Sequence, residues 1–232
     1  HAIGDGASAA MPLSLLGMLD QRQANYSRAR QRLEQALDTF RHNGDRWHTA
    51  FVLTNLGLTA FRQKHYDRAR QCFEEAIELY RSLGDKGALA IALSEMGDVA
   101  LTLDENDEAR RLYNASLDLW QGLNIPGGIA WARHNLAFLD LLNSGPEGVD
   151  DVLRECEDAL RRVDDRYKLA SLLVSRAIVA IYKHDYALAH RLYGESLAMR
   201  LQLGDRRGMT DTLVIVGMNA HAQGQMAACV QL

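Results

Sequence analysis

Residue types that catalyse reactions or bind metals are scattered along this sequence. Its eight histidines are dispersed, and His184 and His190 are six residues apart, on opposite sides of a helix or across its end. The motifs H-E-x-x-H, G-x-x-x-x-G-K-[ST] and G-x-G-x-x-G are absent. Acidic pairs such as Glu74-Glu75 diverge on a helix and indicate solvated faces. We therefore expect no catalytic site, no metal site and no cofactor, and predict that this segment is not an enzyme.

Two asparagines have the chemistry to hold a polypeptide. Asn55 and Asn135 are separated by two periods of a forty-residue repeat, described below. An asparagine amide has two donors and an acceptor, so it can pair with the backbone of an extended peptide whatever the side chains of that peptide are. The alternative is that each amide bonds a neighbouring helix and fixes how the helices stack. The sequence leaves both interpretations open.

A pair of aromatic residues is a second candidate for binding. Trp131 and Phe138 are seven residues apart and hence on one helix face, and with Trp120 they could form an aromatic seat for a ligand. The competing interpretation is packing between repeats.

These candidates lie within an internal repeat of forty residues. A column of small residues comprises Gly17, Gly57, Gly97, Ala137, Ala177 and Gly217, and a column of large residues comprises Leu33, Phe73, Tyr113, Leu153 and Tyr193. A third column comprises the pairs Gly44-Asp45, Gly84-Asp85, Asn124-Ile125, Asp164-Asp165 and Gly204-Asp205. Such periodicity is typical of a solenoid.

Each period divides into two helical halves. Residues 66–83 place Ala69, Phe73 and Tyr80 on one apolar face with the spacing of a helix, and residues 47–61 show a similar stripe. At each Gly-Asp pair, glycine can adopt the left-handed conformation that ends a helix, and aspartate can cap the next helix. The small column lets two helix backbones approach closely.

The pattern resembles the tetratricopeptide repeat (TPR), in which a Leu-Gly pair lies in the first helix and Tyr and Ala open the second. The forty-residue period and the segments 53–57, 195–205 and 223–229 are similar to the long repeats of bacterial signalling regulators. The resemblance implies an all-α, TPR-like α-solenoid, a right-handed superhelix of about five and a half helical hairpins. We expect residues 1–10 to be a leader that is disordered or left by cloning, and residues 11–232 to be one domain with a truncated last hairpin.

In such an array the first helix of each hairpin lines the inner, concave wall, where partners bind. We predict a binding surface from the polar and aromatic residues that the helical pattern turns inward. These residues are Phe51, Thr54, Asn55, Arg62, Glu95, Asp98, Trp131, His134, Asn135 and Phe138.

Composition restricts the compartment and the partners. The net charge of −4 argues against direct nucleic-acid binding by this segment, and no apolar run approaches the ~20 residues of a membrane span. The three cysteines Cys72, Cys156 and Cys229 are far apart and lack C-x-x-C spacing, which favours a reduced, cytoplasmic setting.

The function predicted from these observations is a non-catalytic interaction or sensor module of a larger bacterial regulator, such as a transcriptional regulator in signal transduction. Its partner would be a protein or peptide segment on the concave surface. The alternatives are a self-association module that forms a homodimer and a small-molecule effector-sensing domain.

Charges interrupt the packing columns in the fourth and fifth repeats. Arg133, Asp140, Glu157 and Arg176 stand at positions that are apolar in most other repeats. Because a buried charge must be paired, we predict an ion network among these four side chains.

Overall fold

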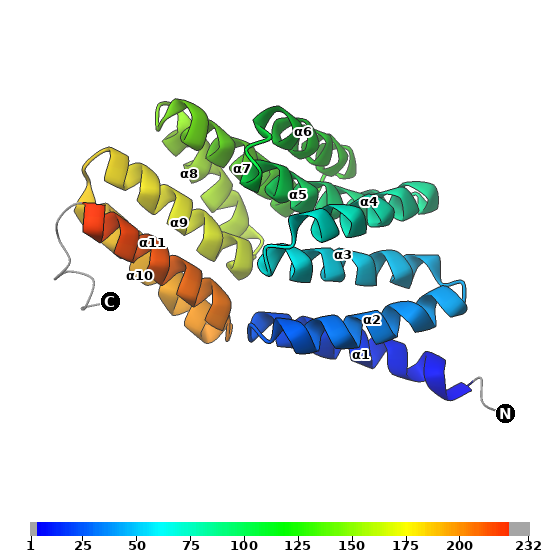
Figure 1. Cartoon of the computed structure of the whole chain (residues 1–232). Coiled ribbons are helices and arrows are strands. Elements are labelled where there is room, and N and C mark those ends of the chain that lie inside the picture. Colours follow the sequence, from blue (N-terminus) through cyan, green and yellow to red (C-terminus); the bar gives the residue numbers. More distant parts are fainter. Residues whose placement is uncertain (1–3, 223–232) are drawn as a thin grey trace. The chain divides into compact units, whose positions relative to one another are not determined.

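The computed structural model describes residues 4–222, which form eleven α-helices and no strands (Figure 1). The chain divides into two compact units, 1–124 and 125–232. Unit 1 contains α1 (Gly4–Arg22), α2 (Tyr26–His42), α3 (Arg46–Arg62), α4 (Tyr66–Leu83), α5 (Lys86–Thr102) and α6 (Asn106–Leu123). Unit 2 contains α7 (Pro126–Ser144), α8 (Val149–Arg162), α9 (Arg166–Tyr182), α10 (Tyr186–Gln202) and α11 (Arg206–Ala222).

Consecutive helices pair into hairpins, each with a first helix A and a second helix B. In unit 1 the hairpins are α1–α2, α3–α4 and α5–α6; in unit 2 they are α7–α8 and α9–α10, and α11 packs beside α10 and α9. Within each unit every helix B also packs against the helix A that follows it. This is the architecture of an α-solenoid, as the repeat predicts.

The turns between hairpins follow the predicted chemistry. Gly84 and Gly204 have φ of 71° and 66°, in the left-handed region that favours glycine. The following aspartates cap the next helix: Asp85 accepts a hydrogen bond from the Ala88 amide at 2.9 Å, and Asp205 accepts one from the Gly208 amide at 2.9 Å.

The turns inside the hairpins contain a feature that the sequence analysis missed. Ala24, Lys64, Asp104 and His184, spaced at multiples of forty residues, all have positive φ. The fourth repeat departs from this pattern, because α7 continues to Ser144 and α8 begins only at Val149.

The column of small residues permits close helix packing, as expected. A Cβ added at Gly57 would lie 2.8 Å from the Phe73 ring, and one at Gly97 would lie 2.5 Å from the Tyr113 ring. Helices A and B of one hairpin therefore interlock through a glycine and a large side chain.

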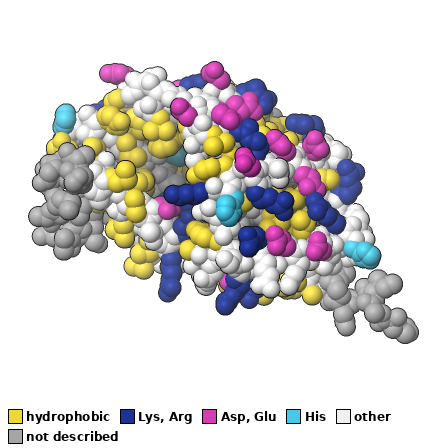
Figure 2. Space-filling view, in the orientation of Figure 1, with side chains coloured by type: hydrophobic (Ala, Val, Ile, Leu, Met, Phe, Trp, Pro, Cys, Tyr) yellow, Lys and Arg dark blue, Asp and Glu magenta, His cyan; other side chains and the backbone are white. Residues whose placement is uncertain are grey.

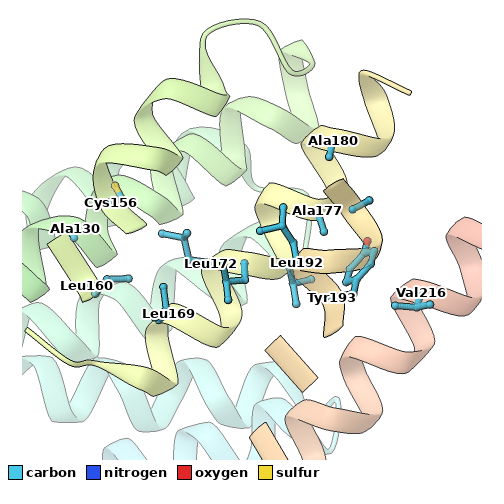
Figure 3. Close-up of a cluster of buried hydrophobic side chains, with 13 residues drawn as sticks. Ala130, Cys156, Leu160, Leu169, Leu172, Ala177, Ala180, Leu192, Tyr193 and Val216 are labelled. Carbon is cyan, nitrogen blue, oxygen red and sulfur yellow. The ribbon is translucent and has the colours of Figure 1, made fainter. Parts of the chain in front are cut away.

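The larger buried cluster of unit 2 is built mainly from α9 and α10, and a second one joins α7, α8 and α9. Figure 3 shows Leu172 of α9 with Leu192 and Tyr193 of α10, and Val216 of α11 belongs to the same buried cluster. Cys156 is also part of this cluster, and it and Cys72 are buried free thiols. Cys229 lies outside the described residues.

The structure bears on three expectations, which concern the N-terminal leader, the number of domains and the last hairpin. Helix α1 begins at Gly4, so residues 4–10, which were expected to be a leader, are helical. The chain forms two compact units, and its single-domain character and the handedness of its superhelix stay predictions. The sixth helix A is present as α11; its partner helix would fall outside the described residues.

Candidate partner-binding site

All ten predicted site residues lie on A helices. Helix α3 supplies Phe51, Thr54, Asn55 and Arg62; α5 supplies Glu95 and Asp98; α7 supplies Trp131, His134, Asn135 and Phe138. The first two helices belong to unit 1 and the third to unit 2, so the structure describes two separate groups.

In unit 1 the amide of Asn55 is committed to its own helix. Its Nδ2 donates to the carbonyl oxygen of Phe51 at 2.8 Å. The backbone carbonyl of Asn55 also accepts a hydrogen bond of 2.6 Å from Nε2 of Gln21 on α1. The Thr54 hydroxyl likewise donates to the Ala50 carbonyl at 2.9 Å. These bonds support the stacking interpretation for Asn55.

In unit 1 the Asp98 carboxyl interacts with Tyr113 and with the charge of Arg62. The Tyr113 hydroxyl donates to Asp98 Oδ1 at 2.7 Å. Burial raises the pKa of Asp98, although the Tyr113 hydrogen bond and the charge of Arg62 act in the opposite direction. The Arg62 guanidinium lies 5.2 Å from the centre of the Phe61 ring, and its Nε is buried without a hydrogen-bond partner. This part of unit 1 is polar and carries charge.

In unit 2 three rings of α7 form a stack. The ring centroids of Trp131 and His134 are 4.7 Å apart with an interplanar angle of 23°, and those of His134 and Phe138 are 6.3 Å apart at 20°. His134 is buried between two half-buried rings. Trp120, which the sequence analysis grouped with this seat, is on α6 and lies beside Gly87 of α5 in unit 1.

His134 connects α7 to α9 in a neutral state. Its Nε2 is 2.9 Å from Oγ of Ser175, and its Nδ1 is 3.1 Å from Oδ1 of Asn135. Burial lowers the pKa of His134 to about 4, so the ring is uncharged at neutral pH. In enzymes, a serine nucleophile can be activated by a histidine base that a third polar side chain orients. Here all three side chains are buried, and Ser175 and His134 fix the orientation of the Asn135 amide.

Asn135 differs from Asn55 in the partners of its amide. Asn135 is 7% exposed, and its Nδ2 has no hydrogen-bond partner, whereas its Oδ1 is held by His134. A buried donor without a partner costs about 1–3 kcal/mol. A ligand that supplies an acceptor to this amide would recover that energy.

A cluster of ion pairs joins α8 to α9, and sequence reasoning found it only in part. Arg176 of α9 pairs with Glu157 and lies 3.7 Å from Asp150, both on α8. Asp150 also pairs with Lys183 at 2.9 Å. The predicted pair of Glu157 and Arg176 is confirmed, but Arg133 pairs instead with Glu155, at 2.7 Å on the surface.

Asp150, which the sequence analysis did not include in the predicted network, lies within this cluster of ion pairs. It is the second residue of α8, and its buried position follows from the late start of that helix at Val149. The sequence analysis missed Asp150 because it did not recognise the longer loop between α7 and α8.

Other classes of site find little support in the described residues. Within residues 4–222 no group of three or more His, Cys, Asp and Glu side chains is placed to hold a metal ion. No described helix has both the length and the apolar character that a membrane span requires. Basic and acidic side chains intermingle on the face shown in Figure 2, and no continuous basic stripe crosses it.

Comparison with known proteins supports a TPR-like fold. The family model of the tetratricopeptide repeat matches residues 7–82. A Rap protein complexed with Competence and Sporulation Factor is 13% identical with a TM-score of 0.77, over 94% of this chain and 61% of that one. The Rap conjugation gene regulator of the plasmid pLS20, in complex with the Phr* peptide, is 13% identical with a TM-score of 0.77, over 90% and 58% of the two chains.

Aspartyl phosphate phosphatase F from Bacillus subtilis is 14% identical with a TM-score of 0.74, over 100% of this chain and 60% of that one. This chain thus spans about three fifths of the length of these structural neighbours. No curated protein matches its sequence.

Proposed function

We propose that this chain, which has the fold of a TPR-like solenoid, is a non-catalytic interaction module that binds a polypeptide segment on the A helices of unit 2. TPR-like folds are generally protein-interaction scaffolds, and two of the similar structures are complexes, one of them with the Phr* peptide. The proposed site comprises Trp131, His134, Asn135 and Phe138 on α7, with Ser175 on α9.

The observation that carries the proposal is the uncommitted amide of Asn135. The oxygen of the same amide holds the Asn135 side chain in place. This Oδ1 accepts a hydrogen bond from the neutral His134 ring, and the ring is itself held by a hydrogen bond to Ser175. The Trp131 and Phe138 rings stack on either side of the His134 ring, and their half-buried faces offer apolar surface to a bound segment. A backbone carbonyl of an extended peptide is a suitable acceptor, and it requires no particular side chain.

A matched pair of variants tests this site. Peptide ligands are first selected against the immobilised chain from a displayed library of random sequence. The affinity of a selected peptide is then measured by fluorescence anisotropy for the wild type, Asn135→Ala and Asn55→Ala. Asn55 is the control because it occupies the same column and its Nδ2 already donates within α3.

We expect Asn135→Ala to lower the affinity for the peptide by roughly tenfold, because the lost hydrogen bond contributes about 1 kcal/mol or somewhat more. Asn55→Ala should leave the affinity nearly unchanged. Failure to select any peptide, or equal affinities for the wild type and Asn135→Ala, would contradict the proposal.

The wider setting is also a proposal. The similarity in fold to Rap proteins, one of them a conjugation gene regulator, supports a module of a bacterial signalling or transcriptional regulator. The net charge of −4 supports a protein partner over nucleic acid. The buried free thiols Cys72 and Cys156 agree with a cytoplasmic location.

A further inference from the structure

The Asn135 amide belongs to a surface that runs along two neighbouring A helices. Residues four, seven and eleven apart on a helix share one face. The face of α7 that starts at Trp131 and the face of α9 that starts at Ser171, forty residues later, therefore occupy equivalent positions. The hydrogen bond between His134 and Ser175 places the two helices side by side. We call the residues of the two faces the α7–α9 surface: Trp131, Asn135, Phe138, Leu142, Ser171, Ser175, Ile178 and Tyr182.

The α7–α9 surface is apolar at its far end and carries no charged residue. Leu142 and Tyr182, in the last turns of α7 and α9, are 54% and 56% exposed. Phe138 and Ile178, one turn before them, are half-buried. Large apolar side chains that are exposed together on one surface are typical of a binding site.

The same columns of the repeat have a different character in unit 1. They contain three charged residues, Arg62 of α3 with Glu95 and Asp98 of α5. Arg62 is the equivalent of Leu142, forty residues apart for each repeat. The hairpins therefore form with a charged residue in this column, and their packing does not explain an exposed leucine there. Contact with an apolar partner does explain it.

Charged residues close to this surface already pair with residues of α8. Lys183 of α9 pairs with Asp150 at 2.9 Å, and Arg133 of α7 pairs with Glu155 at 2.7 Å. A charged side chain of a ligand that became buried beside Asn135 would have no counter-ion on the α7–α9 surface. Burying an unpaired charge is unfavourable, so the surface should reject charged side chains.

We propose that the polypeptide segment bound on the α7–α9 surface is uncharged and apolar, and that its side chains pack against Phe138, Leu142 and Tyr182. This inference rests on the proposed function and adds the class of partner to it. The Asn135 amide binds a backbone carbonyl of the segment, which any sequence offers. The apolar columns beside it select the side chains.

Peptide selection on three proteins tests the selectivity. A displayed library of random sequence is selected in parallel on the wild type, on Leu142→Arg and on Leu201→Arg, and the enriched pools are sequenced. Leu201→Arg is the control, because Leu201 is 67% exposed on α10, outside the α7–α9 surface, and the added charge is the same. Both substituted residues are exposed, so the fold should survive, and circular dichroism checks this.

The wild-type and Leu201→Arg pools should be enriched in aliphatic and aromatic residues and depleted of Asp, Glu, Lys and Arg relative to the unselected library. The Leu142→Arg pool should gain Asp and Glu, because the new arginine supplies a counter-ion. One peptide of the wild-type pool is then synthesised with each apolar residue replaced in turn by Asp. In fluorescence anisotropy at least one replacement should lower the affinity for the wild type by roughly tenfold or more, and Leu142→Arg should recover part of that loss.

Failure of this inference is distinguishable from failure of the proposed function. A selection that enriches no peptide on the wild type overturns both. Enriched peptides that lose affinity for Asn135→Ala, but contain charged residues as often as the unselected library, overturn the apolar selectivity alone. A Leu142→Arg pool with the composition of the wild-type pool also overturns it, because Leu142 then lies outside the contact.

Discussion

His134 on α7 and Ser175 on α9 are linked by a hydrogen bond of 2.9 Å between Nε2 and Oγ, and both side chains are buried. The bond joins α7 and α9, two of the A helices of unit 2, at the centre of the proposed binding site. Because Nδ1 of the same ring holds Asn135 Oδ1, the neutral imidazole determines how the asparagine amide is presented.

The state of His134 makes the stability of the protein depend on pH. An unfolded chain protonates this histidine near its ordinary pKa of 6.5, but the folded chain keeps it neutral until about pH 4. Between these values the unfolded state binds more protons, so the free energy of unfolding falls as the pH falls, by up to about 3 kcal/mol in total. We expect His134→Asn to make this dependence shallower.

Chemical denaturation at a series of pH values measures the effect. The control is the same substitution at an exposed histidine, His65→Asn, at the start of α4. Parallel curves for the wild type and His134→Asn would show that His134 is not buried in a neutral form.

The interlocking of A and B helices predicts the effect of adding one methyl group. A Cβ at Gly97 would lie 2.5 Å from the Tyr113 ring, so Gly97→Ala should destabilise the protein by about 1–3 kcal/mol. A Cβ at Gly194 in α10 would have no such neighbour within 4 Å, and Gly194→Ala should stabilise by up to ~1 kcal/mol through helix propensity. Thermal unfolding of both variants compares the two; equal effects would argue against close packing at Gly97.

The ion pairs between α8 and α9 predict non-additive mutations. Arg176→Leu removes one partner of Glu157 and Asp150, but Glu157 keeps Arg161, and Asp150 keeps two other cations, so the loss of stability should be roughly 1–3 kcal/mol. The double variant Arg176→Leu with Glu157→Leu restores residues typical of these columns and should recover most of that loss. Urea denaturation of the single and double variants tests this. Additive destabilisation would mean that the charges do not act as a pair.

The turns between hairpins give a backbone prediction. Gly84 ends α4 with φ of 71°, and a β-branched residue fits this conformation poorly. Gly84→Val should therefore lower the free energy of unfolding by more than ~1 kcal/mol. Denaturant unfolding that shows no change would indicate that the turn adopts another conformation.

Most of the fold follows from residues that recur in the sequence. The Gly-Asp column predicted the left-handed turns at Gly84 and Gly204, and the small column predicted the close approach of two helices that is seen at Gly57. The turns at Ala24 and Lys64 were missed because neither residue type signals a positive φ. Their regular spacing was the only available signal.

The candidate site was less accessible from the sequence. Column position identified Asn55 and Asn135 as equivalent, but it could not show that one amide bonds its own helix while the other keeps a free donor. That difference arises from tertiary contacts of His134 with Ser175, forty-one residues away. Likewise, Asp150 was overlooked because its place in the ion cluster depends on where α8 begins.

A fluorescence titration tests the central claim, that a polypeptide binds on α7, most directly. Trp47→Phe with Trp120→Phe leaves Trp131 as the single tryptophan, and Trp47→Phe with Trp131→Phe leaves Trp120 on α6 as the control reporter. A selected peptide without tryptophan is titrated into both proteins. The account predicts a saturable change in the emission of Trp131, with the affinity found by anisotropy, and little change in that of Trp120. Binding that leaves the Trp131 emission unchanged would contradict it.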